Sequence, residues 1–129
     1  MRKKKVTRSF SFLLHYFFKE YLTSQRGLAE NTIESYKETF KIFTPWLVKK
    51  IQKNKLTIDD IDLMLIFEFL KHLEKERKNS IQTRNIRLAA IKTFFHMCYF
   101  LLPDTKKKFE GIRFVKFKKA PRPLIDYFE

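Results

Sequence analysis

The sequence predicts an all-α domain of four helices with a basic arm at each end. Apolar residues recur at intervals of three and four in four separate stretches, which is the period of an α-helix. The chain has only 2 glycines and 4 prolines, which is little turn material for the many short connections of an all-β fold. With 129 residues, of which 44% are hydrophobic and 15 are phenylalanine, the chain is long enough for one domain with a core rich in aromatic rings.

The first two helices are predicted on either side of a short connection. The first covers residues 11–23 and has a broad apolar face, and Gly27 stands just past its end, where a left-handed residue costs least. The second begins at or just after Asn31, a suitable N-cap, and Glu34 can complete a capping box. Because Pro45 lies inside the apolar stripe of this helix, we expect a kink or a break near the proline.

The third and fourth helices follow in the second half of the chain. The third begins after Asp62, whose carboxylate suits the positive end of a helix dipole. The fourth begins after Ser80, a potential N-cap, and ends before Pro103. Its predicted buried stripe is Ile86, Ala90, Phe94, Met97 and Leu101. We expect the bundle to pack through Phe17, Phe40, Phe43, Phe69, Leu73, Phe94 and Met97.

The fourth helix changes character along its length. Its second half is almost wholly apolar, whereas its first half carries polar and basic side chains such as Gln82, Arg84 and Asn85. Arg, Asn and Gln can form paired hydrogen bonds with base edges in the DNA major groove, and a helix N-terminus attracts phosphate. We expect Arg84 and Arg87 to face the same way. An ordinary amphipathic helix with a solvated basic face would show the same pattern.

The charge of the chain favours a polyanionic partner. Its net charge is +14, and both ends are basic: five basic residues lie in residues 1–8 and eight in residues 103–122. Such a surplus suits DNA, RNA or an anionic membrane. The ends could follow a phosphate backbone or act only as solubilising tails. After Pro103 we expect an extended, lysine-rich segment, and we expect both ends to be mobile without DNA.

Several other classes of function lack the residues that they need. The single cysteine, Cys98, excludes an intrachain disulfide and a cysteine-rich zinc site, and it is interpreted as a small core residue. The three histidines have no metal-ligand spacing, and Asp59, Asp60 and Asp62 are better explained as helix-start residues than as a metal site. No apolar run is long enough to span a membrane. We therefore expect a cytoplasmic protein without a cofactor or a small-molecule substrate.

Two stretches resemble a known family. They are GLAENTIESYKETFKIF, with a frame of Thr32, Ile33, Tyr36 and Phe40, and SIQTRNIRLAAIKTFFHMCYF, with a Thr-Arg-Asn run, a Leu-Ala-Ala step and a Phe-Phe pair. In this order and spacing they resemble the N-terminal core-binding domain of tyrosine recombinases, also called phage integrases. The resemblance covers about residues 10–128 and implies a small four-helix, SAM-like bundle. It divides the chain into a basic N-terminal arm (1–9), a DNA-binding domain (10–103) and a basic linker toward a catalytic domain (104–129).

The resemblance implies a DNA-binding role for helices two and four. The implied partner is double-stranded DNA, on which the full-length parent would assemble as a multimer. The candidate contact residues are Thr32, Ser35, Tyr36, Lys37, Gln82, Thr83, Arg84, Asn85, Arg87 and Lys92. The family's catalytic His-x-x-Arg motif is absent, and Tyr127 has no such motif around it. We therefore expect a DNA-binding fragment of a recombinase without catalytic activity; the alternative is a basic helical module that binds RNA or protein.

Overall fold

The computed structural model describes residues 7–119, and in that range the chain forms five α-helices. These are α1 (Phe10–Tyr16), α2 (Glu30–Ile51), α3 (Leu63–Lys75), α4 (Ile81–Leu101) and the short α5 (Lys106–Phe109). A π-helix, η1 (Phe17–Gln25), continues α1, and three 3-10 helices complete the set: η2 (Ile58–Asp60), η3 (Pro103–Thr105) and η4 (Glu110–Phe114). The described part has no β-strand and only one isolated antiparallel bridge, between Ser9 and Thr57. The predicted all-α class is confirmed.

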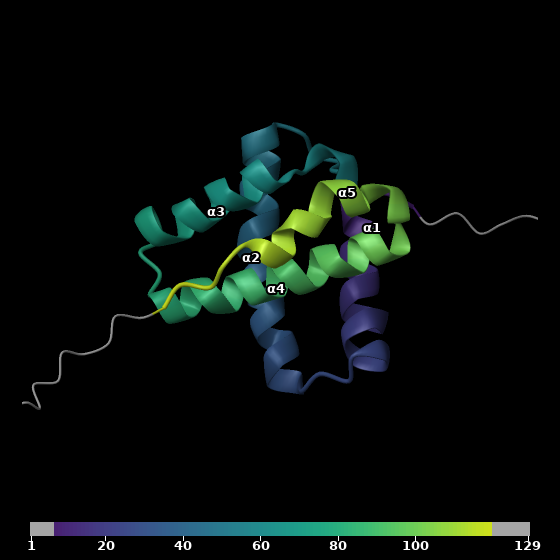
Figure 1. Ribbon diagram of the computed structural model, residues 1–129, viewed down its shortest axis with the longest axis horizontal. Coiled ribbons are helices and arrows are strands. Elements are labelled where there is room, and N and C mark those ends of the chain that lie inside the picture. The colour runs from purple at the N-terminus through teal and green to yellow at the C-terminus, as the bar shows by residue number, and fades with distance from the viewer. Residues whose placement is uncertain (1–6, 120–129) are drawn as a thin grey trace, which may run out of the picture.

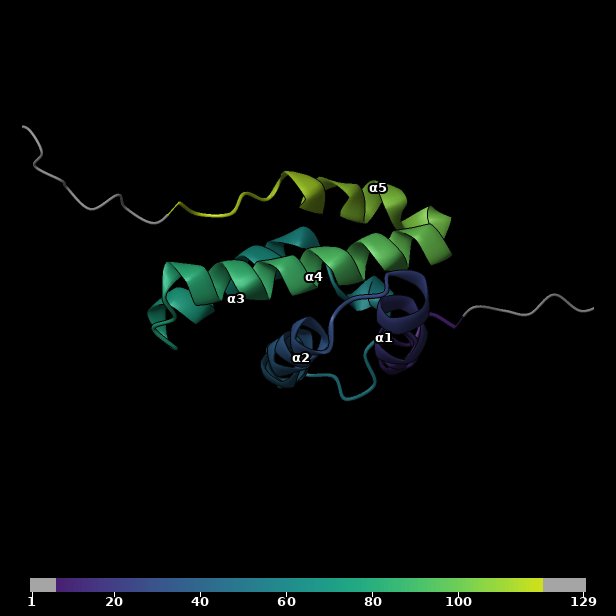
Figure 2. The ribbon, with the colours of Figure 1, turned by 90° about the horizontal axis from the view of Figure 1, so that it is seen from below.

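The helices form three layers (Figures 1 and 2). Helices α1 and α2 make one outer layer, α3 and α4 lie in the middle, and α5 with its flanking 3-10 helices lies on the other side of α4. Helix α4 crosses α2 steeply and runs from the end of α3 toward α1. Since α4 contacts all the other layers, it is the central element of the fold. In the part of the chain that the structure describes, no helix is both long enough and apolar enough to cross a bilayer.

The helix starts are fixed by side-chain caps at three of the four long helical segments. Ser9 Oγ accepts from the Phe12 N–H, Asp62 Oδ1 from the Leu65 N–H and Ser80 Oγ from the Thr83 N–H, at 3.0–3.2 Å. The predicted caps at Asp62 and Ser80 are confirmed. The connection before α2 contains Gly27, which has the left-handed φ of +57° that its place past the first helix predicts.

Helix α2 differs from the prediction at both its start and its middle. It begins at Glu30, with Ala29 as an N-cap that has no side-chain hydrogen bond, so Asn31 lies inside the helix rather than at its cap. The helix also continues through Pro45 without a break. Pro45 and Lys41 are both exposed, so water can satisfy the Lys41 carbonyl that loses its backbone donor.

The core is a cluster of phenylalanine rings centred on Phe94. Its ring centroid lies 5.1–5.4 Å from those of Phe10, Phe17 and Phe40, and 5.0 Å from that of Phe95. These edge-to-face and tilted arrangements are the favourable geometries for aromatic pairs. The predicted core residues Phe17, Phe40, Phe43, Phe69, Leu73, Phe94 and Met97 are all buried. Cys98 is also fully buried, which raises the pKa of its thiol.

The predicted buried stripe of α4 is wrong at its N-terminal end. Ile86 is 39% exposed, whereas Ala90, Phe94 and Met97 are fully buried. The buried side of the first half of α4 turns instead toward α3 and the C-terminal segment and carries Arg84 and Leu88. Spacing alone does not show which side of the first half of α4 meets other elements, so it placed Ile86 incorrectly.

The prediction of an extended tail after Pro103 is wrong for residues 103–114, which are helical. This segment buries Phe109, Ile112 and, just beyond η4, Val115, and the Phe109 ring lies 4.7 Å from that of Phe95. Gly111 lies so close to α3 that an added Cβ would stand 2.8 Å from Leu63 Cδ1. The apolar residues follow a mixture of α and 3-10 turns, so they show no clear helical period in the sequence. Residues 115–119 then run along α4 toward its N-terminal end (Figure 1).

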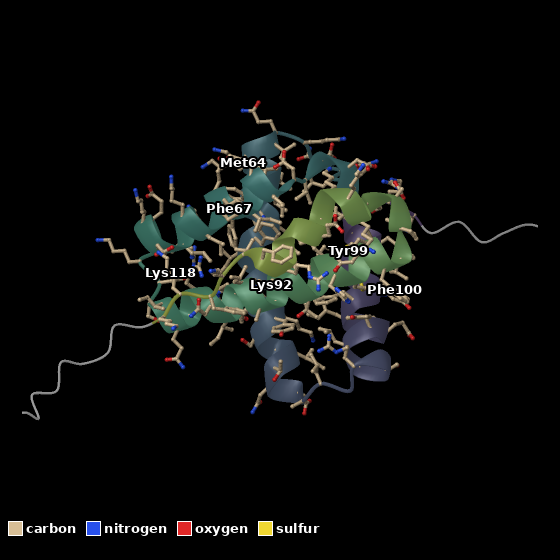
Figure 3. The ribbon with its side chains drawn as sticks, viewed as in Figure 1. Met64, Phe67, Lys92, Tyr99, Phe100 and Lys118 are labelled. Atoms are coloured by element: carbon tan, nitrogen blue, oxygen red, sulfur yellow. The ribbon has the colours of Figure 1, made fainter. Side chains whose placement is uncertain are left out.

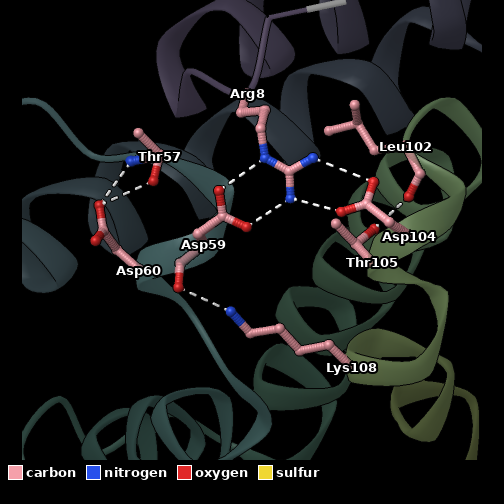
Figure 4. A network of polar contacts seen from close by, with 8 residues as sticks. All are labelled: Arg8, Thr57, Asp59, Asp60, Leu102, Asp104, Thr105 and Lys108. Atoms are coloured by element: carbon pink, nitrogen blue, oxygen red, sulfur yellow. Dashed lines mark hydrogen bonds and ion pairs between the residues drawn. The ribbon is translucent and has the colours of Figure 1, made fainter.

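The N-terminal segment is tied to the core by backbone and ionic contacts (Figure 4). The Phe10 N–H donates to the Leu56 carbonyl at 3.0 Å, and the Ile58 N–H donates to the Arg8 carbonyl at 2.8 Å. The Arg8 guanidinium bridges Asp59 and Asp104, with its Nε 2.7 Å from Asp59 Oδ2. Arg8 was predicted to belong to a mobile arm and is in fact held in place. Residues 1–6 of that arm and residues 120–129 lie outside the described range.

Candidate nucleic-acid interface

Helices α2 and α4 meet at a polar crossing that carries Arg87. The Arg87 Nη1 donates to Thr39 Oγ1 at 3.4 Å, and Thr39 in turn donates to the Ser35 carbonyl one turn earlier. The buried Nε of Arg87 has no hydrogen-bond partner among the described residues. Burial is the main cause that lowers the pKa of Arg87; Glu38 opposes this effect and Arg77 adds to it. Arg87 is thus a half-buried cation with unused donor capacity.

The residues before Arg87 form the first turns of α4. Ser80 caps the helix, and its hydroxyl lies 3.1 Å from Thr83 Oγ1. Gln82 and Ile86 are exposed, and Thr83 is half-buried. With Arg77 close enough to act on Arg87, this end of α4 presents both cationic and neutral polar groups. Nothing in the local sequence around Arg77 shows that it approaches α4.

Four of the candidate residues lie in the first half of α2. Thr32, Ser35 and Tyr36 are half-buried, and Lys37 is exposed and pairs with Glu34 at 3.4 Å. The Tyr36 ring is stacked on the Phe17 ring, with the ring centroids 6.4 Å apart, so it packs against the core. Ser35 lies next to the crossing with α4 through the Thr39 hydrogen bond. The structure therefore brings Ser35 and Arg87 into one region.

Arg84 lies on a different side of α4 from Arg87. Only 6% of Arg84 is exposed; its Nη1 donates to the Lys116 carbonyl at 3.0 Å and to Asn85 Oδ1 at 3.1 Å. Its Nε is 3.7 Å from Glu74 Oε2, an ion-pair distance that is too long for a hydrogen bond. The expectation that Arg84 and Arg87 face the same way is wrong, since one contacts α3 and the C-terminal segment and the other contacts α2.

Asn85 and Lys92 also contact the C-terminal segment. Asn85 forms a two-point contact with the backbone of Lys118: its Nδ2 donates to the carbonyl at 2.7 Å and its Oδ1 accepts from the N–H at 2.9 Å. The Lys92 ammonium is 4.6 Å from the centroid of the Phe117 ring. Figure 3 shows Lys92 in the middle of α4 and Lys118 near its N-terminal end. Of the ten candidate residues, Arg84, Asn85 and Lys92 are therefore engaged by residues 113–118.

The acidic cluster predicted as helix-start residues has separate structural partners. Asp60 Oδ2 accepts from the Thr57 N–H at 2.8 Å and completes a capping box at η2. Asp62 caps α3, and Asp59 pairs with Arg8. Hydrogen bonds with Thr57 and Arg8, respectively, are the main causes that lower the pKa values of Asp60 and Asp59. Within residues 7–119 no group of three or more metal-ligating side chains comes together.

The described residues form an all-α helical domain, and comparison with known families identifies its class. Residues 17–99 match the model of the phage integrase N-terminal SAM-like domain. Since this match covers more than half of the chain, the protein belongs to that family, the N-terminal domains of tyrosine recombinases.

Individual relatives agree with the family. The chain is 32% identical over 117 residues to a protein of Sinorhizobium fredii named "Putative integrase/recombinase y4rC", and this match covers 89% of the chain and 35% of the relative. It is 38% identical over 86 residues to a second integrase/recombinase of that species, y4rD, with 65% and 31% covered. It is 35% identical over 78 residues to the tyrosine recombinase XerC of Herpetosiphon aurantiacus, with 60% and 24% covered. The chain thus spans about a third or less of the length of these relatives. No solved structure was found to match it.

Proposed function

We propose that this domain binds duplex DNA through the region where the first halves of α2 and α4 meet, and that it positions a recombinase on its DNA site. The observation that carries the proposal is Arg87, a half-buried guanidinium with one long hydrogen bond to Thr39 and an unpartnered Nε. Such a group gains more from an incoming phosphate or base edge than a fully solvated lysine does.

The surroundings of Arg87 support the same role. Gln82 and Thr83 lie on the first turn of α4 and offer groups that can reach base edges, and Ser35 offers a hydroxyl from α2. The net charge of +14 supplies attraction to phosphate that does not depend on sequence. On α2, Lys37 and Lys41 are paired with Glu34 and Glu38, which leaves fewer free cations for DNA, so we expect α4 to make the closer approach.

The test compares Arg87→Ala with Lys75→Ala by fluorescence anisotropy on a duplex at fixed low salt. Both variants remove one positive charge, and Lys75 is an exposed residue of α3 for which no ion pair exists among the described residues. If Arg87 contacts guanine, its loss costs about 1–3 kcal/mol; if it contacts phosphate, the salt slope falls by about one. Circular dichroism checks that each variant is folded.

Three results would contradict the proposal. Equal losses of DNA affinity in the two variants would mean that the chain attracts DNA only through diffuse charge. Tighter binding of single-stranded or duplex RNA than of DNA would favour an RNA-binding module. No measurable binding of RNA or DNA would remove a nucleic-acid role. Arg84 is left out of the proposed contact set because its guanidinium is buried and engaged by Lys116 and Glu74.

The catalytic part of the proposal concerns the rest of a recombinase. We infer that residues 1–129 alone neither cleave nor join DNA, because no His-x-x-Arg motif is present in them. In the parent protein, which we expect to act as a multimer on DNA, a separate catalytic domain would supply these residues. A covalent adduct between the purified 129-residue chain and a DNA strand, detected by denaturing gel electrophoresis, would contradict this inference.

A further inference from the structure

Three basic residues from distant parts of the sequence line one small pocket. Arg26 comes from the connection between η1 and α2, Lys92 from the middle of α4, and Arg113 from η4. The pocket has a volume of about 280 Å³, and His96 and Tyr99 line it from the second half of α4. Figure 3 shows Lys92 and Tyr99 along α4, within the stretch that carries this pocket.

The charges in this pocket are not neutralised by the protein. None of its lining residues is acidic, and within residues 7–119 Arg26, Lys92 and Arg113 take part in no ion pair. Lys92 is half-buried, and among the described residues its ammonium has only the Arg113 carbonyl, at 3.4 Å, and the face of the Phe117 ring as partners. Burial and the nearby charge of Arg84 lower the pKa of Lys92, so an anion bound in the pocket would stabilise its ammonium.

The remaining walls are suited to an anion that carries several oxygens. His96 Nδ1 and the Tyr99 hydroxyl are 2.8 Å apart, a hydrogen bond that fixes the imidazole ring beside the cations. Arginine guanidinium groups can bind a phosphate through two parallel N–H bonds, and the lysine ammonium adds a positive point charge. The volume leaves room for the phosphate and its ester substituents.

We propose that the pocket lined by Arg26, Lys92 and Arg113 is a phosphate-binding site. The phosphate could belong to a DNA backbone that extends past the α2–α4 crossing or to a free phosphorylated molecule. The inference rests on the proposed DNA-binding function only if the phosphate belongs to a DNA backbone. The sequence alone does not show the site, because its three cations are separated by 66 and 21 residues in the chain.

The experiment uses the complete 129-residue chain in two arms. In the first, inorganic phosphate and pyrophosphate are titrated at constant ionic strength against chloride, and the amide and side-chain NMR signals of Lys92, His96 and Arg113 are followed. In the second, the salt dependence of duplex binding is measured by anisotropy. The test variant is Arg26→Gln/Arg113→Gln, and its matched control is Lys49→Gln/Lys75→Gln. All four side chains are exposed, so both variants should fold, and both lose two charges.

We expect saturable shifts with phosphate that the test variant loses and the control keeps. If the ligand is the DNA backbone, the salt slope of the test variant also falls by about two, since each phosphate contact contributes about one, and the control changes less. Saturable phosphate shifts with an unchanged salt slope of DNA binding support a site whose ligand is a free phosphate. A fall in that slope without phosphate shifts supports a site whose only ligand is a phosphodiester. No saturable shift together with equal slopes in the two variants would overturn the proposal.

This outcome is separable from that of the DNA-binding proposal. Arg87 does not line the pocket, so Arg87→Ala should leave the phosphate shifts unchanged while it weakens DNA binding. If the chain binds no DNA but keeps the phosphate shifts, the proposed function fails and the phosphate site stands. If Arg87→Ala weakens DNA binding but no variant changes the phosphate response or the salt slope of DNA binding, the proposed function stands and the phosphate site fails.

Discussion

The two halves of α4 are held in the domain by different chemistry. The second half places Phe94, Phe95 and Met97 in an aromatic core from which water is excluded. The first half adds polar contacts to the buried Leu88: Arg84 and Asn85 are bound to the C-terminal segment, and Arg87 is bound to Thr39 of α2. Apolar burial supplies most of the stability, whereas exposed polar groups supply specificity. Substitutions in the two halves should therefore separate stability from recognition.

The largest effect is expected at Phe94. Its ring contacts those of Phe10, Phe17, Phe40 and Phe95, and its side chain is fully buried. Phe94→Ala should lower the free energy of unfolding by roughly 3–5 kcal/mol through lost burial and a residual cavity. A denaturant titration measures this change, and a loss below about 1 kcal/mol would show that the aromatic centre of the core lies elsewhere.

The next largest loss of stability is expected in the segment after α4. Ile112 is 1% exposed, whereas Phe114, two residues later, is 74% exposed. Ile112→Ala should destabilise the domain by about 2–4 kcal/mol, and the control Phe114→Ala should change stability by less than about 0.5 kcal/mol. Both are measured by chemical denaturation. Equal, small changes would mean that η4 is not part of the folded unit.

A smaller and more local effect is expected at Asn85. Its amide holds both backbone groups of Lys118, so Asn85→Ala removes two hydrogen bonds near the surface. We expect a loss of about 1 kcal/mol in global stability and a marked loss of hydrogen-exchange protection at the Lys118 amide. Gln82→Ala, an exposed change on the same helix, is the control and should leave that amide unaffected. Unchanged protection at Lys118 in both variants would show that Asn85 does not hold the segment.

The sequence predicts the parts of this fold that depend on local chemistry. The N-caps at Asp62 and Ser80, the left-handed Gly27 and the phenylalanine core all follow from residue type and spacing. Pro45 misled the prediction because its helix-breaking tendency depends on whether water can reach the carbonyl one turn earlier. The predicted N-cap of α2 was misplaced because Asn is a residue type that favours this position, whereas the helix already begins at Glu30.

The candidate site is less predictable because it depends on which elements meet. Arg84 and Arg87 have the same residue type and stand three apart, yet one is buried against Glu74 and the other lies at the α2 crossing. Nothing local distinguishes them. The convergence of Arg26, Lys92 and Arg113 depends on the folding of residues 103–114 back onto α4, a segment whose sequence predicts an extended tail. DNA contact by the candidate residues stays a prediction.

The smallest expected effect concerns the contact at the other end of the described chain, between Arg8 and Asp59. The hydrogen bond from Arg8 is the main cause that lowers the pKa of Asp59 below 3.8, and the charges of Arg8 and Lys108 act in the same direction. A carboxyl with a lowered pKa in the folded state stabilises the fold above its unfolded pKa, and this contribution is lost as the pH falls through the folded value. The side chains of Arg8 and Asp59 are 36% and 54% exposed, so solvent screening limits the contribution of the pair to less than about 1 kcal/mol.

The free energies of unfolding of the wild type and Asp59→Asn should therefore differ slightly at pH 6 and converge below about pH 3.8. Asp60 titrates in both proteins, so its contribution cancels in the difference. Because the ion pair is exposed, added salt should also narrow the gap at pH 6. A gap that widens toward acid pH would mean that the Arg8–Asp59 contact does not act through ionised Asp59.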